Sequence, residues 1–154
     1  MKYRFCLLCV VIFLPIASGM GLTSKVALRI QHSPEQQRTE LTLDKNLQRG
    51  AQEKAAVLSE AQLCAHEYPA GDWPNAAARR TGFRLHSSYR VDANHIESLV
   101  CGITDPELVA PLLWASEGHR QHVFGLEEFF AAQNRIGVGY DNGYFVIWIA
   151  REQE

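Results

Sequence analysis

The sequence predicts one α+β domain whose helices come first and whose strands pair in antiparallel fashion. Residues 43–63 show apolar side chains at helical spacing over a charged opposite face, which is typical of an amphipathic helix. Residues 135–140 and 144–150 are apolar runs that flank Asp141, Asn142 and Gly143, a combination that favours a tight hairpin. A closing hairpin makes the sheet antiparallel at least at its C-terminal end.

The chain has 154 residues, and the first nineteen are predicted to be a secretory signal peptide. Lys2 and Arg4 precede an apolar run from residue 5 to residue 16, and small residues follow it. The run is shorter than the ~20 residues of a membrane span, although a retained N-terminal anchor is the alternative. We expect a protein that is secreted or periplasmic, with no integral span after signal removal.

The mature chain is expected to be mildly acidic. Removal of the signal leaves 13 basic and 17 acidic side chains, a formal charge of −4. Without a basic stripe, the chain is a poor candidate for binding nucleic acid. Residues 20–33 are polar and weakly patterned and are assigned to an N-terminal linker, and residues 34–154 to a single domain that is expected to be monomeric.

Four local patterns place the remaining elements. The long helix is expected to contain Gly50, at a cost of about 1 kcal/mol relative to alanine, and Lys54, which must extend out of the apolar stripe. Short helices are predicted from Pro34, with Ser33 as cap, and from a cap at Asn75 to Arg80, ahead of Gly82. Thr104 and Glu107 form a capping box, and Pro111 kinks the helix that follows. Gly137 and Gly139 indicate close packing within a strand rather than a nucleotide loop.

The chemistry is concentrated after Trp114, which we expect to anchor the end of its helix in the core. Glu117, His119 and His122 follow within eight positions of it. His66 and Glu97 are the groups that they are expected to meet. Glu97 lies among Ile96, Leu99 and Val100, so this carboxylate is expected to be partly buried and hydrogen-bonded.

Two cysteines, Cys64 and Cys101, remain after removal of the signal. In an exported chain they can form one disulfide, and two buried free thiols are the alternative. Cys64 lies two residues before His66 and Cys101 four residues after Glu97, so a cleft that joins those polar side chains would bring the sulfur atoms close. The disulfide is therefore the preferred prediction.

The order of these features resembles the CAP superfamily (SCP-like domains), which includes sperm-coating proteins, plant pathogenesis-related proteins, venom allergens and exported bacterial proteins. The resemblance covers residues 34–150 and is carried by His66 after the long helix, by Glu97, by the segment from Trp114 to Arg120, and by the strand Arg135–Gly139. It implies an α-β-α sandwich with a cleft formed by His66, Glu97, Glu117 and His119.

The sequence also departs from the family pattern. Ile96 and Ser98 replace the Gly and Asn that flank the acid, and the region before the last hairpin, residues 129–133, lacks the second cleft histidine of animal and plant members. His119 could substitute for it. Members of this fold are variously described as binding sterols, lipids, peptides or divalent metals, so the resemblance implies no single activity.

Two functions remain open at this point. The first, which we prefer, is a non-catalytic binding module that holds a peptide, a lipid or a cell-envelope component. The second is a metal-dependent hydrolase in which His66 and His119 bind Zn²⁺ and Glu97 or Glu117 orients a ligand or accepts a proton. A buried network that only stiffens the fold would use the same side chains. No serine or cysteine, including Ser98, Ser116 and Cys64, is expected to act as a nucleophile.

Overall fold

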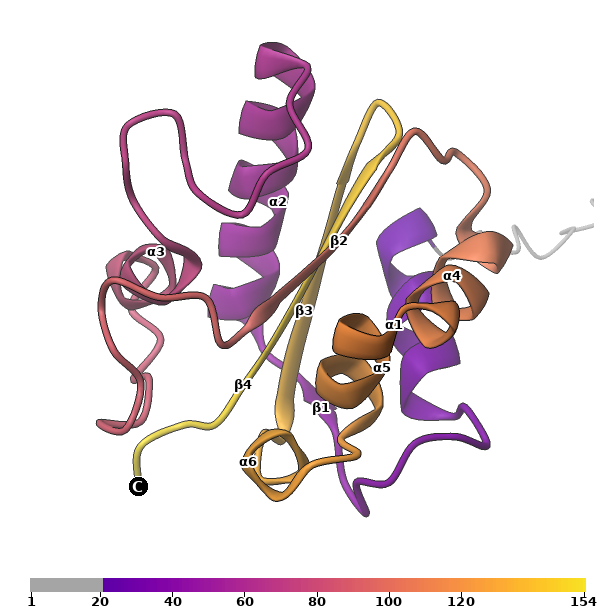
Figure 1. Ribbon diagram of the computed structural model, residues 1–154, viewed down its shortest axis with the longest axis vertical. Helices are drawn as coiled ribbons and strands as arrows, with labels where there is room; N and C mark the ends of the chain where they lie inside the picture. Colours follow the sequence, from indigo (N-terminus) through magenta and orange to yellow (C-terminus); the bar gives the residue numbers. More distant parts are fainter. Residues whose placement is uncertain (1–20) are drawn as a thin grey trace, which may run out of the picture.

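A four-stranded sheet lies between two layers of helices (Figure 1). The computed structural model describes residues 21–154, so the predicted signal peptide, residues 1–19, lies outside the described residues. The strands are β1 (Thr42–Leu43), β2 (Glu97–Cys101), β3 (Arg135–Asp141) and β4 (Tyr144–Ala150), in the order β1-β3-β4-β2. β3 pairs with β4 and β4 with β2 in antiparallel fashion. β1 runs parallel to β3, so the sheet is antiparallel over its C-terminal strands, as expected, and parallel only at its short β1 edge.

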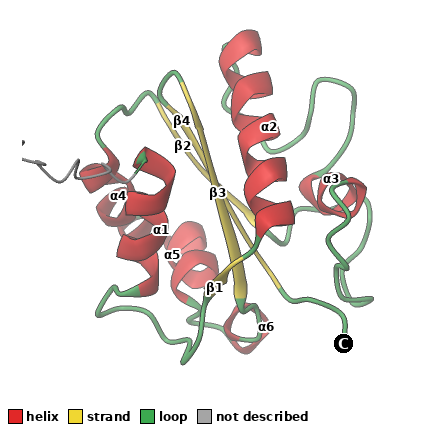
Figure 2. Cartoon of the chain, turned by 180° about the vertical axis from the view of Figure 1, so that it is seen from behind, coloured by secondary structure: helices red, strands yellow, loops and turns green. Residues whose placement is uncertain are grey.

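The helices cover both faces of this sheet (Figure 2). One face packs against α2 (Lys45–Ala61) and α3 (Pro74–Arg80). The other packs against α1 (Leu22–Gln31), α4 (Val109–Ala115) and α5 (Glu117–Phe124), with the single-turn elements η1 (Pro106–Leu108) and α6 (Glu128–Ala131) beside them. The predicted α-β-α sandwich is therefore confirmed. Among the described residues, no helix is both long enough and apolar enough to cross a membrane.

The N-terminal segment is not the linker that its polar composition indicated. Residues 22–31 form α1, whose Val26, Ala27 and Ile30 are fully buried in the core. These three side chains share one helical face. No helix begins at Pro34, because the chain turns there and continues extended towards β1. The domain therefore starts earlier than residue 34.

The long helix was predicted correctly, and two glycines of the sheet explain how closely it packs. Asp44 caps α2 by accepting hydrogen bonds from the N–H groups of Asn46 and Leu47. A Cβ atom at Gly137 would lie 2.3 Å from the backbone nitrogen of Gln48, and one at Gly139 would lie 2.1 Å from the carbonyl oxygen of Ala51. The backbones of α2 and β3 are thus in direct contact, as the close-packing interpretation required.

Gly50, which seemed to weaken α2, is required by the core. A Cβ atom there would lie 2.3 Å from the ring of Trp148. Trp148 is fully buried, whereas Trp114 is 38% exposed, so the prediction that Trp114 anchors its helix in the core is wrong. The indole in the core belongs to β4, on the face of the sheet that α2 covers.

Two smaller predictions also need correction. Lys54 does not reach solvent: it is fully buried, its Nζ donates to the carbonyl oxygen of His66 at 2.7 Å, and it lies 3.7 Å from the ring centroid of Tyr68. The Thr104 capping box does not form, because the Asp105 side chain accepts the hydrogen bond from the N–H of Glu107.

Candidate functional site

The sequence and the structure agree on a buried carboxylate beside a histidine. Glu97 opens β2 and is 4% exposed. Its Oε1 lies 3.0 Å from Nδ1 of His66, and its Oε2 accepts a hydrogen bond of 2.8 Å from Nε1 of Trp148. Because a carboxylate only accepts hydrogen bonds, Nδ1 of His66 carries the proton. In the neutral imidazole, Nε2 of His66 is then the nitrogen that lacks a proton.

Two contacts hold the segment that carries His66 against the sheet. A disulfide joins Cys64 to Cys101, with their Cα atoms 6.2 Å apart, so the preferred alternative for the two cysteines is the one observed. Lys54 binds the carbonyl oxygen of His66 from α2. Burial lowers the pKa of Lys54, while the nearby charge of Glu97 acts in the opposite direction. The positive charge of Lys54 and the negative charge of Glu97 thus attract each other in the buried layer between α2 and the sheet.

A small cleft of about 240 Å³ opens where β2 begins. His66, Glu97 and His119 all line it, so the structure brings these three predicted side chains together. Glu117 is exposed and is not among the lining residues, which the prediction had placed with them. Burial, with a further contribution from the His66 charge, lowers the pKa of His119.

The cleft contains two further histidines, of which His122 belongs to the segment that was expected to meet His66 and Glu97, whereas His95 does not. Four of the six histidines of the chain line it, because His95 and His122 join His66 and His119. Nδ1 of His95 lies 3.0 Å from Nδ2 of Asn75. Burial lowers the pKa of His95. No signal in the sequence joins residues 20 positions apart in this way.

A serine and a histidine also meet at the base of the cleft, contrary to expectation. The Oγ of Ser98 lies 2.7 Å from Nδ1 of His122, and Nε2 of His122 lies 3.4 Å from the carbonyl oxygen of Ile149. This is the order of a nucleophile, a base and an orienting group. However, Ser98 is only 1% exposed, and burial, aided by the charge of Arg38, lowers the pKa of His122 to about 3. A base with so low a pKa is poorly suited to activating a hydroxyl at neutral pH, and the contact ties α5 to β2.

The donor set does not match a resident metal. Within residues 21–154 there is no group of three or more His, Cys, Asp or Glu side chains placed to hold an ion. His66 and His119 could offer two nitrogens, but both oxygens of Glu97 are already bonded. A catalytic zinc ion normally has three protein ligands. The described residues therefore supply fewer ligands than such a site requires.

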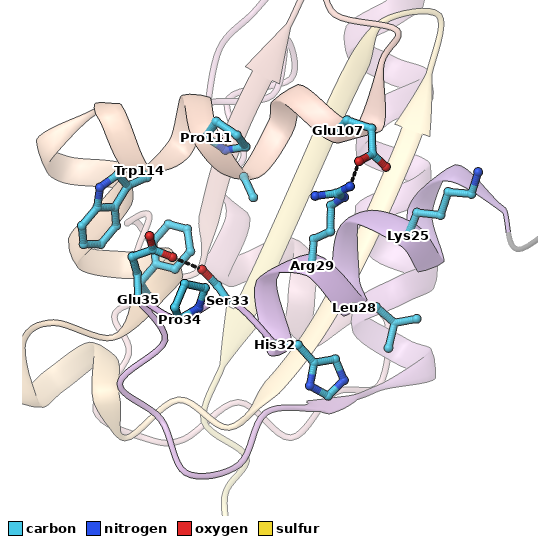
Figure 3. Close-up of a pocket in the computed structure, with 12 residues that line it drawn as sticks. Lys25, Leu28, Arg29, His32, Ser33, Pro34, Glu35, Glu107, Pro111 and Trp114 are labelled. Atoms are coloured by element: carbon cyan, nitrogen blue, oxygen red, sulfur yellow. Dashed lines mark hydrogen bonds and ion pairs between the residues drawn. The ribbon is translucent and has the colours of Figure 1, made fainter.

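A larger groove lies between α1 and α4 (Figure 3). Its volume is about 740 Å³. Its apolar wall comprises Leu28, Ala110, Pro111, Trp114 and Phe124, and its polar rim comprises Lys25, Arg29, His32, Ser33, Glu35 and Glu107.

One aromatic contact and one ion pair organise the groove. Trp114 packs against Phe124 in a T-shaped arrangement, with ring centroids 5.2 Å apart, and both rings line the groove. Arg29 of α1 forms an ion pair with Glu107 of η1, at the end of the groove away from Trp114 (Figure 3). Sequence reasoning missed this site because it treated α1 as a linker.

Comparison with known proteins gives matches at the level of structure. No family model matches the sequence, and no curated protein matches it. An extracellular protein of Bacillus anthracis that contains an SCP domain superposes with a TM-score of 0.66 at 15% identity. The match covers 85% of this chain and 40% of that chain, so this chain spans less than half the length of that protein.

A second solved structure agrees. An outer surface protein of Borrelia burgdorferi superposes with a TM-score of 0.60 at 20% identity, over 84% of this chain and 89% of that chain. Both identities are low, and the shared property is the arrangement of helices and strands. Together with the α-β-α layers and the His66–Glu97 pair at the head of β2, these matches show that the chain has the CAP, or SCP-like, fold.

Proposed function

We propose that this chain is an exported, non-catalytic binding module whose ligand site is the groove between α1 and α4. Export is supported by the charged and apolar pattern of residues 1–19 and by neighbours described as an extracellular and an outer surface protein. The observation that carries the binding role is the groove itself, which at about 740 Å³ is some three times larger than the His66 cleft at about 240 Å³. Ligand pockets usually fall in the range of roughly 300–1,000 Å³.

The lining of the groove favours an amphipathic ligand with an anionic head. The wall is made of aliphatic and aromatic side chains, with Trp114 open at one end. Arg29 of the rim is paired with Glu107, whereas Lys25 has no ion-pair partner among the described residues and is the basic group that an anionic head could meet. A long-chain carboxylate would bury its chain against the wall and place its head near Lys25.

Oleate titration followed by tryptophan fluorescence and calorimetry tests this proposal on residues 21–154. We expect one oleate per chain, with tighter binding than oleyl alcohol because the alcohol has no charge for the rim. Trp114→Ala removes an apolar contact worth about 1.5–3 kcal/mol and should weaken binding roughly ten- to a hundredfold. Leu112→Ala is the matched control: Leu112 is similarly exposed on α4 but does not line the groove. Equal loss in both variants, or no saturable binding, would reject the groove as the site.

A metal-dependent hydrolase is the second candidate, and the His66–Glu97 hydrogen bond is the observation that favours it. A carboxylate that holds one imidazole nitrogen is typical of metal-binding histidines. Calorimetry with Zn²⁺ separates the two candidates. Stoichiometric binding that is lost in a His66→Ala, His119→Ala double variant would support the hydrolase. Our proposal expects no stoichiometric binding.

A further inference from the structure

A separate small pocket opens where the chain leaves β4, at the end of the sheet that Figure 1 shows beside α6 and the C-terminus. Its volume is about 330 Å³, close to the lower limit of roughly 300 Å³ for ligand pockets, which suits a small molecule. The lining comes from the loop between α3 and β2, from α6 and the residue after it, and from the residue after β4. These lining residues are Ser88, Tyr89, Glu128, Phe129, Ala132 and Arg151. None of them lines the α1–α4 groove or the His66 cleft.

Main-chain and aromatic contacts hold this pocket in shape. The N–H of His86 donates to the carbonyl oxygen of Arg151 at 3.1 Å, which ties the loop to the end of β4. The ring of Phe129 packs against Tyr89, with centroids 5.3 Å apart, and against His95, with centroids 5.5 Å apart. Phe129 is still 40% exposed and lines the pocket, so an apolar surface is available there to a ligand.

The hydroxyl of Tyr89 carries a proton for which the described residues offer no acceptor. Its oxygen accepts from the N–H of Arg151 at 3.2 Å and from Nε2 of Gln133 at 3.0 Å. The Gln133 amide cannot be reversed, because Nε2 also donates to the carbonyl oxygen of His95 at 2.8 Å. Burial raises the pKa of Tyr89, against the opposing effects of its hydrogen bonds and of the Arg151 charge. The hydroxyl is therefore protonated at neutral pH and has one hydrogen bond left to donate.

Two opposite charges at the pocket also have no partner among residues 21–154. The guanidinium of Arg151 forms no ion pair or side-chain hydrogen bond there, whereas the nearby Arg84 and Arg135 both pair with Glu152. The carboxylate of Glu128 forms none either, and it does not pair with Arg151 across the pocket. A ligand that carries one negative and one positive group would give both charges a partner.

We propose that this pocket binds a free α-amino acid with an apolar side chain. The carboxylate of the amino acid binds Arg151 and accepts the hydrogen bond from the Tyr89 hydroxyl. Its ammonium group binds Glu128, and its side chain packs on Phe129. A simple anion fits less well, because it would bring a like charge towards Glu128. An internal residue of a peptide carries neither charge. The site does not depend on the α1–α4 groove or on an oleate-like ligand.

Calorimetry and ¹⁵N spectra of residues 21–154 with L-leucine and L-phenylalanine form the first arm of the test. We expect one amino acid per chain and shifts of the Phe129, Ala132 and Arg151 amide signals. Leucinamide lacks the carboxylate and 4-methylpentanoate lacks the ammonium group, so each should bind at least roughly tenfold more weakly than L-leucine. Equal binding of either analogue, no saturable binding of both amino acids, or shifts centred elsewhere would overturn the proposal.

The second arm pairs each variant with the analogue that lacks the matching charge. Arg151→Gln should weaken L-leucine at least roughly tenfold without weakening leucinamide. Glu128→Gln should weaken L-leucine to a similar extent without weakening 4-methylpentanoate. Glu127→Gln is the matched control, because Glu127 is the exposed neighbour that does not line the pocket. An equal loss in the control, or parallel losses for L-leucine and the paired analogue, would overturn the assignment. Trp114→Ala should bind L-leucine unchanged, which separates this result from failure of the groove.

Discussion

Replacing Glu97 by glutamine should destabilise the fold and move a proton on His66. Glu97 is 4% exposed and accepts hydrogen bonds from His66 and from Trp148 with its two oxygens. An amide has one accepting oxygen and one NH₂ group. Because the indole N–H of Trp148 can only donate, the amide oxygen must face Trp148 and the NH₂ must face Nδ1 of His66. Nδ1 then has to become the acceptor.

The size of the effect follows from the loss of charge. Hydrogen bonds to a charged group contribute about 1.5–3 kcal/mol and neutral ones about 0.5–1.5 kcal/mol. Two such bonds change, so Glu97→Gln should lower the free energy of unfolding by about 2–3 kcal/mol. The buried cation of Lys54 also loses a nearby opposite charge, which acts in the same direction.

Urea unfolding measures the stability, and ¹⁵N chemical shifts of the neutral imidazole measure the tautomer. In the native chain we expect the His66 proton on Nδ1, and in Glu97→Gln on Nε2. Glu117→Gln is the control, because Glu117 is exposed and its replacement should change stability by less than about 0.5 kcal/mol. An unchanged tautomer in Glu97→Gln, or a loss no larger than in the control, would refute the reasoning about the buried network.

Two further predictions concern the helix packed at each face of the sheet. Burial, followed by the charge of Arg38, lowers the pKa of His122 to about 3, so the unfolded chain binds a proton there that the folded chain does not. The free energy of unfolding should therefore rise with pH between about 3 and 6.5, by up to about 1.4 kcal/mol per pH unit from this group. In His122→Gln, the free energy of unfolding measured with urea should rise less steeply with pH over this range, because one proton fewer is released on folding. Gly139→Ala would press a Cβ against the backbone of Ala51 at 2.1 Å and should cost at least about 3 kcal/mol or abolish folding, whereas Gly118→Ala, with open space around it, should be neutral or stabilising by up to about 1 kcal/mol in thermal melts. Equal melting temperatures for the two alanine variants would contradict the packing of α2 on β3.

Much of the fold could be predicted because its signals are local. The apolar spacing of residues 45–61 and the turn between β3 and β4 each lie within one segment. Glu97 could be placed in a buried setting because its neighbours in sequence are apolar. The disulfide could be preferred because the positions of Cys64 and Cys101 follow from the same cleft.

The failures have a common physical cause, which is that burial depends on contacts distant in sequence. Trp114 and Trp148 both sit in apolar runs, yet only Trp148 lies on a strand covered by α2. Ser98 and His122 are 24 positions apart and meet only because α5 packs on β2. A polar, weakly patterned composition concealed α1, whose apolar face is only three residues wide.

In the candidate site, too, the features with local sequence signals could be predicted, and those that depend on distant contacts could not. The pairing of His66 with Glu97 could be anticipated from the order of motifs. The absence of Glu117 from the cleft lining depends on the direction in which α5 runs, which the sequence does not give. The groove could not be anticipated at all. It needs two helices that the sequence separates by about eighty residues, and one of them had been assigned to a linker.

The measurement that tests the central claim most directly is paramagnetic broadening by a spin-labelled fatty acid bound to ¹⁵N-labelled residues 21–154. Stearate with a nitroxide midway along its chain places the label wherever the apolar part of the ligand is held. A ligand in the groove should broaden the amide signals of Leu28, Ala110 and Trp114 and leave those of His66 and His119 sharp. Broadening centred on His66 and His119, or spread evenly over the surface, would contradict the assignment of the groove as the binding site.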